Sequence, residues 1–174
     1  MNDLNLPKYL QDLLDTSRSG MGAGDTTGGL QTSLQGIADA GIAAGIADMV
    51  AVTERRGQQV ETILASHNTV SKADQAQYEF NEGPCIQAAY EDGLLYSEDL
   101  SAETRWPRWA PTAWSLGVRA VLSVQLYNDS HRLGALNLYS TRTRQYGHEE
   151  LTMARYIATN ASLVLAHFRR DENL

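Results

Sequence analysis

Two neighbouring segments of alternating apolar and polar residues constrain the fold of this chain most strongly. Residues 118–127 read VRAVLSVQLY, and residues 133–139 read LGALNLY. Successive side chains of an extended strand point to opposite faces, so each segment presents one face that is more apolar than the other. Between them lie the turn residues Asn128, Asp129 and Ser130. The sequence therefore predicts two antiparallel strands joined by a tight turn.

Three shorter segments rich in strand-forming residues extend this pair into a sheet. Residues 49–53 and residues 60–65 are separated by a short polar stretch, at the distance typical of a hairpin. Residues 94–97, which read LLYS, are a fifth strand candidate. The strands together predict a sheet that is largely antiparallel.

The final segment, residues 149–170, has the clearest helical pattern of the chain. Its apolar residues recur at spacings of three and four, with two glutamates in the first turn and two arginines in the last. These charges match the helix dipole at both ends. Residues 30–46 repeat the helical spacing but contain three glycines, which indicates either a closely packed neighbouring backbone or a frayed helix. Helices before and after a run of strands predict an α+β domain.

Residues 1–29 are expected to form a separate N-terminal part. Residues 7–15 suit a short amphipathic helix, and residues 17–29, SRSGMGAGDTTGG, hold five of the chain's 14 glycines. Such a composition is typical of a flexible linker. The folded domain is then expected at residues 30–174, a length that suits a single domain.

The composition disfavours several classes of function. The chain has 14 basic and 21 acidic side chains and a net charge of −7, and its basic residues are dispersed, which disfavours direct nucleic-acid binding. Its one cysteine cannot form an intrachain disulfide, and the four histidines lack metal-ligand spacing, so we expect no metal and no cofactor. Since no segment has the pattern of a membrane span or a signal peptide, we expect a cytoplasmic protein that does not contact membranes.

Four segments carry a resemblance to a known family. They are residues 77–85 (QYEFNEGPC), 99–107 (DLSAETRWP), 117–126 (GVRAVLSVQL) and 133–140 (LGALNLYS). In this order they resemble the GAF domain, and specifically the subgroup found beside ANTAR RNA-binding domains in actinobacterial regulators. The resemblance extends over nearly the whole chain that is expected to fold.

The resemblance implies an α+β GAF fold, with an antiparallel sheet of about six strands. The N- and C-terminal helices would pack on one face of the sheet, and a pocket roofed by residues 70–117 would lie on the other. The pocket floor implied is Val121, Ser123, Asn137 and Tyr139, and the period-two alternation supports this grouping independently. The same side chains also suit a filled core whose polar groups satisfy one another.

Three further residues are candidates for the pocket. Cys85 is expected at the start of a helix that reaches Tyr90, where a thiol can become reactive, although a lone cysteine is more often a small buried hydrophobe. Trp106 and Trp109 are one helical turn apart and either face a ligand or cover the sheet.

One branch of the resembled family is catalytic, the free methionine-R-sulfoxide reductases, and Cys85 occupies the position of one of its cysteines. The carboxylates that bind substrate in that branch are replaced here by Val121, Asn137 and Tyr139. A single sulfur also cannot resolve a sulfenic acid within the chain. We therefore expect no enzymatic activity and assign no catalytic residue. Bilin and haem do not fit the cysteine and histidine positions, while a cyclic nucleotide stays open as a ligand.

The expected function is that of a non-enzymatic sensory or regulatory domain, which binds a small molecule or a partner and signals through a dimerising C-terminal helix. The alternatives are a plain dimerisation or protein-interaction module with a closed pocket and, less favoured, a redox enzyme. An ANTAR module would follow position 174 in the resembled subgroup, so either the domain acts through a separate output protein or the sequence is part of a longer chain. The homodimer interface candidates are Gly41, Gly45, Tyr156, Leu163 and Phe168.

Overall fold

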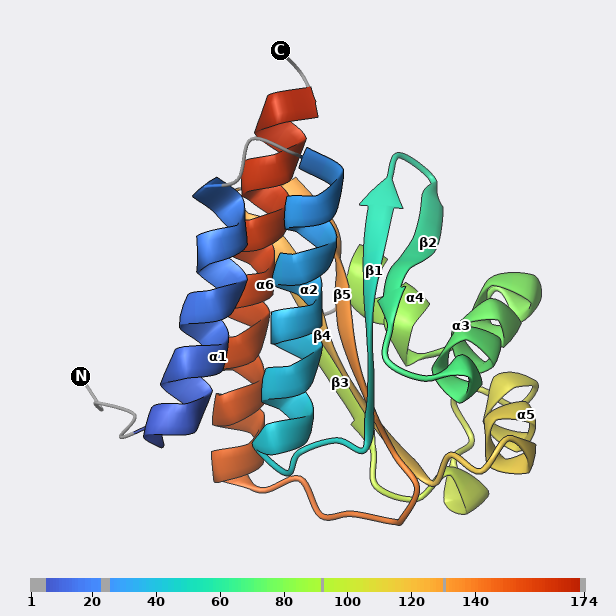
Figure 1. The fold of residues 1–174 in the computed structure, drawn as a ribbon. Coiled ribbons are helices and arrows are strands. Elements are labelled where there is room, and N and C mark those ends of the chain that lie inside the picture. Colours follow the sequence, from blue (N-terminus) through green and yellow to red (C-terminus); the bar gives the residue numbers. More distant parts are fainter. Residues whose placement is uncertain (1–5, 23–25, 92, 130, 173–174) are drawn as a thin grey trace.

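An antiparallel sheet forms the centre of the fold (Figure 1). The computed structural model describes residues 6–22, 26–91, 93–129 and 131–172. Within them the strands follow one another across the sheet in the order β2-β1-β5-β4-β3, and all neighbours pair antiparallel. The strands are β1 (Met49–Arg56), β2 (Gln59–Ala65), β3 (Leu94–Ser97), β4 (Ala120–Asn128) and β5 (His131–Ser140).

The described residues form five strands, which corrects the expectation of about six. After β3 the chain forms a 3₁₀ helix, Leu100–Ala102, whose first turn is capped by the Asp99 carboxylate, which accepts the Ser101 backbone N–H. A second helix, α5 (Trp109–Ser115), then follows before β4 begins. The segment between β3 and β4 is therefore helical and adds no strand.

The register of the central hairpin places the alternating residues as the sequence predicts. Val121 on β4 pairs with Tyr139 on β5, and Ser123 pairs with Asn137. All four side chains are buried on one face of the sheet, while their neighbours Leu122 and Leu138 pack into the core on the other face. The two strands thus have one polar buried face and one apolar buried face.

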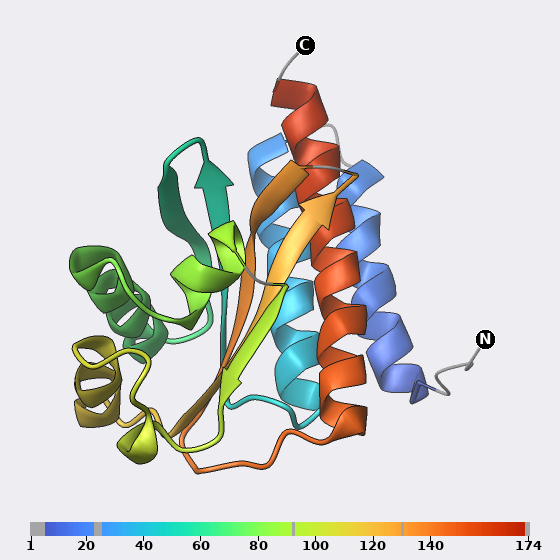
Figure 2. The same ribbon diagram turned by 180° about the vertical axis from the view of Figure 1, so that it is seen from behind.

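Helices cover both faces of the sheet (Figures 1 and 2). The helices α1 (Lys8–Ser19), α2 (Thr26–Ala43) and α6 (His148–Glu172) cover one face, which we call the back. The helices α3 (Asn68–Phe80), α4 (Pro84–Tyr90) and α5 lie on the opposite, front side. The expected placement of the terminal helices on one face is therefore confirmed, and the front helices come from the segment expected to form the roof.

The back core joins the three back helices to the sheet. Leu34 and Ile37 of α2 and Ile157 of α6 pack with the apolar side chains of the sheet's back face. Leu10 and Leu14 of α1 are buried in the same cluster, so this helix packs against the body of the domain. Helix α2 begins at Thr26, inside the segment expected as a linker.

Two glycines of α2 allow close packing. A Cβ added at Gly36 would lie 3.0 Å from the Cβ of Ser17 on α1, and one at Gly41 would lie 3.2 Å from side-chain atoms of Val50 and Leu138. The glycines therefore permit both α1 and the sheet to approach the helix closely. Gly45 follows the helix with a φ of +74°, a conformation that glycine adopts readily.

Candidate functional site

A layer of buried polar side chains lies between the front face of the sheet and the helices α3 and α4. The sheet contributes Ser123, Asn137 and Tyr139, together with Thr53 of β1 and, at the margin of the layer, the half-buried Thr62 of β2. Helix α3 contributes Asp74 and Gln77. Buried polar groups are destabilising unless they are hydrogen-bonded. Their partners therefore define what this layer can do.

Asp74 is the hub of this layer. Its side chain is 0% exposed. Its carboxylate accepts hydrogen bonds from the Tyr139 hydroxyl, from Thr62 Oγ1 at 2.7 Å and, at 3.4 Å, from Asn137 Nδ2. One residue of α3 thus bonds to side chains of β2 and β5, on two different parts of the sheet.

Gln77, one turn after Asp74, forms a second connection. Its Nε2 donates to the Tyr139 hydroxyl at 2.9 Å, and its Oε1 accepts the Cys85 backbone N–H, also at 2.9 Å. The side chain therefore links α3 to β5 and to the first turn of α4. On the floor, Ser123 Oγ donates to Asn137 Oδ1 at 3.0 Å across β4 and β5.

Burial raises the pKa values of the acidic groups in this layer, because it disfavours their charged forms. Desolvation raises the pKa of Asp74 from 3.8 to about 6, against the three hydrogen bonds, which lower it. Burial, and next the nearby Asp74, raises the pKa of Tyr139 well above 10. Asp74 is therefore the group in this layer whose protonation changes nearest to neutral pH.

Cys85 is fully buried at the start of α4. Its Sγ lies 3.3 Å from Thr53 Oγ1, and burial raises the pKa of the thiol to about 12. A nucleophilic cysteine needs a thiolate, which this environment disfavours. The predicted helix from this residue to Tyr90 corresponds to α4.

The two tryptophan candidates pack over the floor. Trp109 is buried, its Nε1 donates to the Ala73 carbonyl at 2.8 Å, and its ring centroid lies 6.5 Å from that of Tyr139. Trp106 is also buried, and it meets Trp109 edge to face at 5.9 Å. Both side chains therefore cover the front face beside the polar layer.

A surface groove reaches the margin of the polar layer. It runs beside β2, the strand at one edge of the sheet, and Thr62, Gln75 and Tyr78 are among its lining residues. The hydroxyls of Thr62 and Tyr78 lie 2.7 Å apart, so Thr62 connects the groove to Asp74. Solvent or a small solute in this groove would meet the layer at its Thr62 end.

Sequence reasoning placed the four floor candidates on one face of the sheet, as the structure does, but missed the residues that α3 contributes. A signal was present, because Val70, Ala73, Asp74 and Gln77 have the spacing of one helix face. All four are buried. Polar residues that share a helix stripe with apolar residues predict a buried polar contact, and this pattern would have pointed to Asp74 and Gln77.

The residues expected at a dimer interface do not form one surface. Gly41 packs against the sheet, and Phe168 is 5% exposed within the back core. Tyr156 is half-buried against the same core, and Gly45 lies exposed beyond the end of α2. Leu163, which is 51% exposed, is the large apolar side chain among them that α6 presents to solvent.

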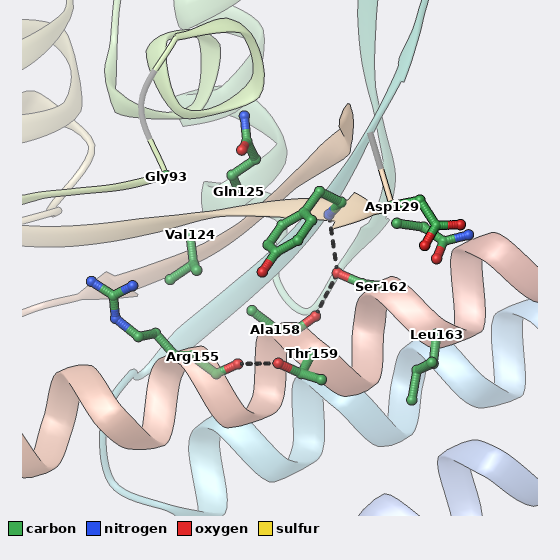
Figure 3. A pocket seen from close by; sticks show the side chains of 11 residues that line it. Gly93, Val124, Gln125, Asp129, Arg155, Ala158, Thr159, Ser162 and Leu163 are labelled. Atoms are coloured by element: carbon green, nitrogen blue, oxygen red, sulfur yellow. Dashed lines mark hydrogen bonds between the residues drawn. The ribbon is translucent and has the colours of Figure 1, made fainter. Parts of the chain in front are cut away.

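Leu163 lines a groove of about 320 Å³ between α6 and the end of β4 (Figure 3). Tyr127, which is 61% exposed, and Val124 add apolar surface. Arg155 and Asp129 lie toward opposite ends of this groove. We refer to it as the α6 groove.

The layer order, the sheet topology and the polar front face covered by helices define an α+β domain with helices on both faces of an antiparallel sheet. The chain belongs to the GAF domain family, whose model matches residues 28–166. No curated protein matches this chain in sequence.

Solved structures share the fold at low sequence identity. The GAF domain of an Acinetobacter phosphoenolpyruvate-protein phosphotransferase matches 97% of this chain and 100% of its own, with 14% identity and a TM-score of 0.68. The chromophore-binding domain of a bacteriophytochrome from R. palustris matches 94% of this chain and 63% of its own, with 12% identity and a TM-score of 0.65. A type II free methionine-R-sulfoxide reductase from Thermoplasma acidophilum matches 83% and 97%, with 11% identity and a TM-score of 0.66.

These neighbours share a fold and differ in the functions that their names describe, so the fold alone does not select a function. Among the described residues, no group of histidine, cysteine and carboxylate side chains is arranged to hold a metal ion. None of the helices in the described ranges has the length and apolar character needed to span a bilayer.

Proposed function

We propose that this GAF domain is a non-enzymatic sensory or regulatory module. It binds a small molecule or a partner protein at its front side. Binding changes the position of the front helices, and this movement is transmitted to a dimer formed through α6. The observation that carries the proposal is the hydrogen-bonded layer in which Asp74 and Gln77 connect α3 to the sheet.

The chemistry of this layer suits a reversible contact. Hydrogen bonds between α3 and the sheet can be replaced by those of a polar ligand, whereas apolar packing offers a polar ligand no such exchange. The groove beside β2 gives such a ligand access to Thr62 and Tyr78. A ligand that binds the displaced roof more tightly than the closed roof shifts the population toward the displaced state.

The central hairpin connects the two sides of the domain. Asn137 and Tyr139 of β5 bond to the front layer, while Leu136 and Leu138 pack in the back core with Ile157 of α6. Because these side chains alternate along one strand, a shift of β5 reaches both layers. This packing supports α6 as the output of the domain.

The α6 groove supports a homodimer, with a second copy as its occupant. Opposite charges flank an apolar centre, with Arg155 toward one end and Asp129 toward the other. In a twofold dimer each surface meets its own copy in reversed direction. Arg155 of one protomer would then face Asp129 of its partner, and Thr159, which lies between the two ends of the groove, would be nearest to the twofold axis.

The absence of catalysis is part of the proposal and rests on Cys85. Burial disfavours its thiolate, and the residue at its side is the neutral Thr53. The same fold in a methionine sulfoxide reductase makes redox chemistry the competing function. Formation of methionine from free methionine-R-sulfoxide at enzyme-like turnover would refute the non-enzymatic assignment.

The finer assignment follows the resemblance of the four sequence motifs. We propose a cytoplasmic regulator of the subgroup found beside ANTAR domains, acting in transcription regulation either through an attached or through a separate output protein. A plain interaction module with a closed front side is the second candidate, and it is favoured by the full burial of Ser123, Asn137 and Tyr139.

Thermal unfolding against a panel of nucleotides, amino acids and anions, combined with light scattering, separates these candidates. A shift that grows with ligand concentration supports the sensor. A dimer without any stabilising ligand supports the interaction module.

The proposed dimer interface has its own test. Leu163→Glu should yield monomers, whereas Ile42→Glu, an exposed apolar position of α2 outside the groove, should not. A dimer that survives Leu163→Glu would refute the α6 interface.

A further inference from the structure

The Asp74 carboxylate is buried among neutral hydrogen-bond donors. Its three partners are Tyr139, Thr62 and Asn137. An ionised carboxylate in a buried site is strongly disfavoured unless a cation or several hydrogen bonds compensate for lost hydration. Neutral donors compensate only in part, so this position favours the protonated acid more than water does.

The titratable groups around Asp74 add no positive charge. They are Tyr139 on β5, Tyr78 on α3, Cys85 on α4 and Glu61 on β2, beside Tyr78. Each of these groups is neutral or negative at neutral pH. A proton taken up by Asp74 therefore removes a charge that no neighbour in this set balances.

The hydrogen-bond network can take up this proton without moving its heavy atoms. With Asp74 ionised, Thr62 Oγ1 donates to Asp74 Oδ2, and the hydroxyl of Tyr78 donates to Thr62. With Asp74 protonated at Oδ2, this acid O–H donates to Thr62 Oγ1 instead. Thr62 then donates to Tyr78, because either hydroxyl of this pair can act as the donor.

A path for the proton leads to solvent. Thr62 and Tyr78 line the groove beside β2, and Thr62 bonds directly to Asp74. Rotation of two hydroxyl groups therefore connects bulk water to a carboxylate that is itself fully buried. A larger ligand would have to displace α3, but a proton needs no cavity.

We propose that Asp74 is a proton-binding site that controls how firmly α3 is attached to the sheet. Protonation removes the uncompensated charge and holds the roof closed, while ionisation weakens the contact between α3 and the strands β2 and β5. The inference rests on the proposed regulatory role of the front side for its biological meaning, and it assigns the proton as one ligand of that side.

Hydrogen exchange of the α3 backbone tests the proposal in the full chain. After correction for the intrinsic pH dependence of exchange, opening of α3 should increase about tenfold between pH 5 and pH 7.5, because the folded pKa lies near 6 and the open value is ordinary. Asp74→Asn should abolish this dependence. Glu79→Gln, an exposed change on the same helix, should retain it.

A second measurement does not depend on the folding of a variant. The carbon-13 shift of the Asp74 carboxyl group, followed from pH 3 to pH 8 in the wild-type chain, should titrate well above the usual range for aspartate. A titration below pH 4.5, or a pH dependence that persists in Asp74→Asn, would overturn the proposal. If no small molecule binds but Asp74 titrates near pH 6, the proton site stands and the small-molecule part of the proposed function fails.

Discussion

The Tyr139 hydroxyl on β5 donates a hydrogen bond to the Asp74 carboxylate on α3, which joins the floor of the front side to its roof. The same hydroxyl accepts a hydrogen bond from Gln77. One phenol therefore serves two positions of α3, one turn apart. Its removal would affect both connections.

Tyr139→Phe should destabilise the domain by about 1 to 3 kcal/mol, because a buried acceptor and a buried donor each lose a partner. The loss should be larger at pH 7.5 than at pH 5, since the ionised form of Asp74 depends more on its donors. Urea unfolding at both pH values measures it. Tyr96→Phe, at an exposed position of β3, is the control, and equal loss in the two variants would contradict the assignment.

The stability of the domain should carry a component from Asp74 that decreases as the pH rises. Its folded pKa is raised from 3.8 to about 6, so the folded state binds the proton more tightly than the unfolded state. The stabilisation is complete below about pH 4 and is lost as the pH rises through 6. From pH 5 to pH 8 this amounts to about 1.4 kcal/mol, and to about 3 kcal/mol over the whole range.

The comparison of wild type with Asp74→Asn isolates this component, because the two proteins share all other titratable groups. Asparagine keeps an acceptor for Tyr139 and can donate to Thr62. We therefore expect Asp74→Asn to be more stable than the wild type at pH 8. Its free energy of unfolding should also change less with pH. A variant that is less stable than wild type at pH 8 would show that the charge is compensated in the folded state.

Cys85 should react slowly in the folded protein. A pKa of about 12 leaves about one thiol in ten thousand ionised at pH 8, and the side chain is fully buried. Alkylation by iodoacetamide, followed by mass spectrometry, should be at least about a thousandfold slower in buffer than in urea. Comparable rates in the two solvents would indicate an accessible thiolate and would reopen the redox function.

The sequence predicted the parts of the fold that depend on local periodicity. The alternation of residues 118–127 and 133–139 corresponds to β4 and β5, and the pairing of Ser123 with Asn137 follows from it. The final helix also corresponds closely to α6. Each of these features follows from the periodic spacing of apolar residues within a single segment.

Contacts between distant segments were less predictable. Periodicity placed Ser123, Asn137 and Tyr139 on one face, but their connections to Asp74 and Gln77 depend on how α3 lies over the sheet. The short N-terminal helix was expected to be separate, yet Leu10 and Leu14 are buried in the back core. Such packing is decided by complementary surfaces that no single segment displays.

Gly41 lowers the helix propensity of α2 but allows the helix to pack closely against the sheet. Gly41→Val should destabilise the domain by about 1 to 3 kcal/mol, because a Cβ would already lie 3.2 Å from Val50 and Leu138. Ala43→Val, at an exposed position of the same helix, introduces the same side chain and should have a smaller effect. Helix propensity alone would make Gly41→Val the milder change, since valine forms helix better than glycine and worse than alanine. Thermal unfolding compares the two, and a loss in Gly41→Val no larger than that in Ala43→Val would contradict the role of the close approach to Val50 and Leu138.

The proposed dimer makes a prediction about charge. If Arg155 of one protomer faces Asp129 of its partner in the α6 groove, then Arg155→Glu and Asp129→Lys should each weaken association, because each places like charges opposite one another. The double variant restores opposite signs and should recover the dimer. Sedimentation at low and high salt measures all four proteins, and the difference between them should shrink as salt screens the charges.

Asp129 has a positive φ of 53°, which aspartate tolerates better than lysine, so circular dichroism should first verify that each variant folds. A double variant as weak as the two single variants combined would show that these side chains act independently. The dimer, if present, would then use another register or another surface. Recovery in the double variant would show that residue 155 of one protomer and residue 129 of its partner face one another across the interface, because two independent substitutions would add their losses.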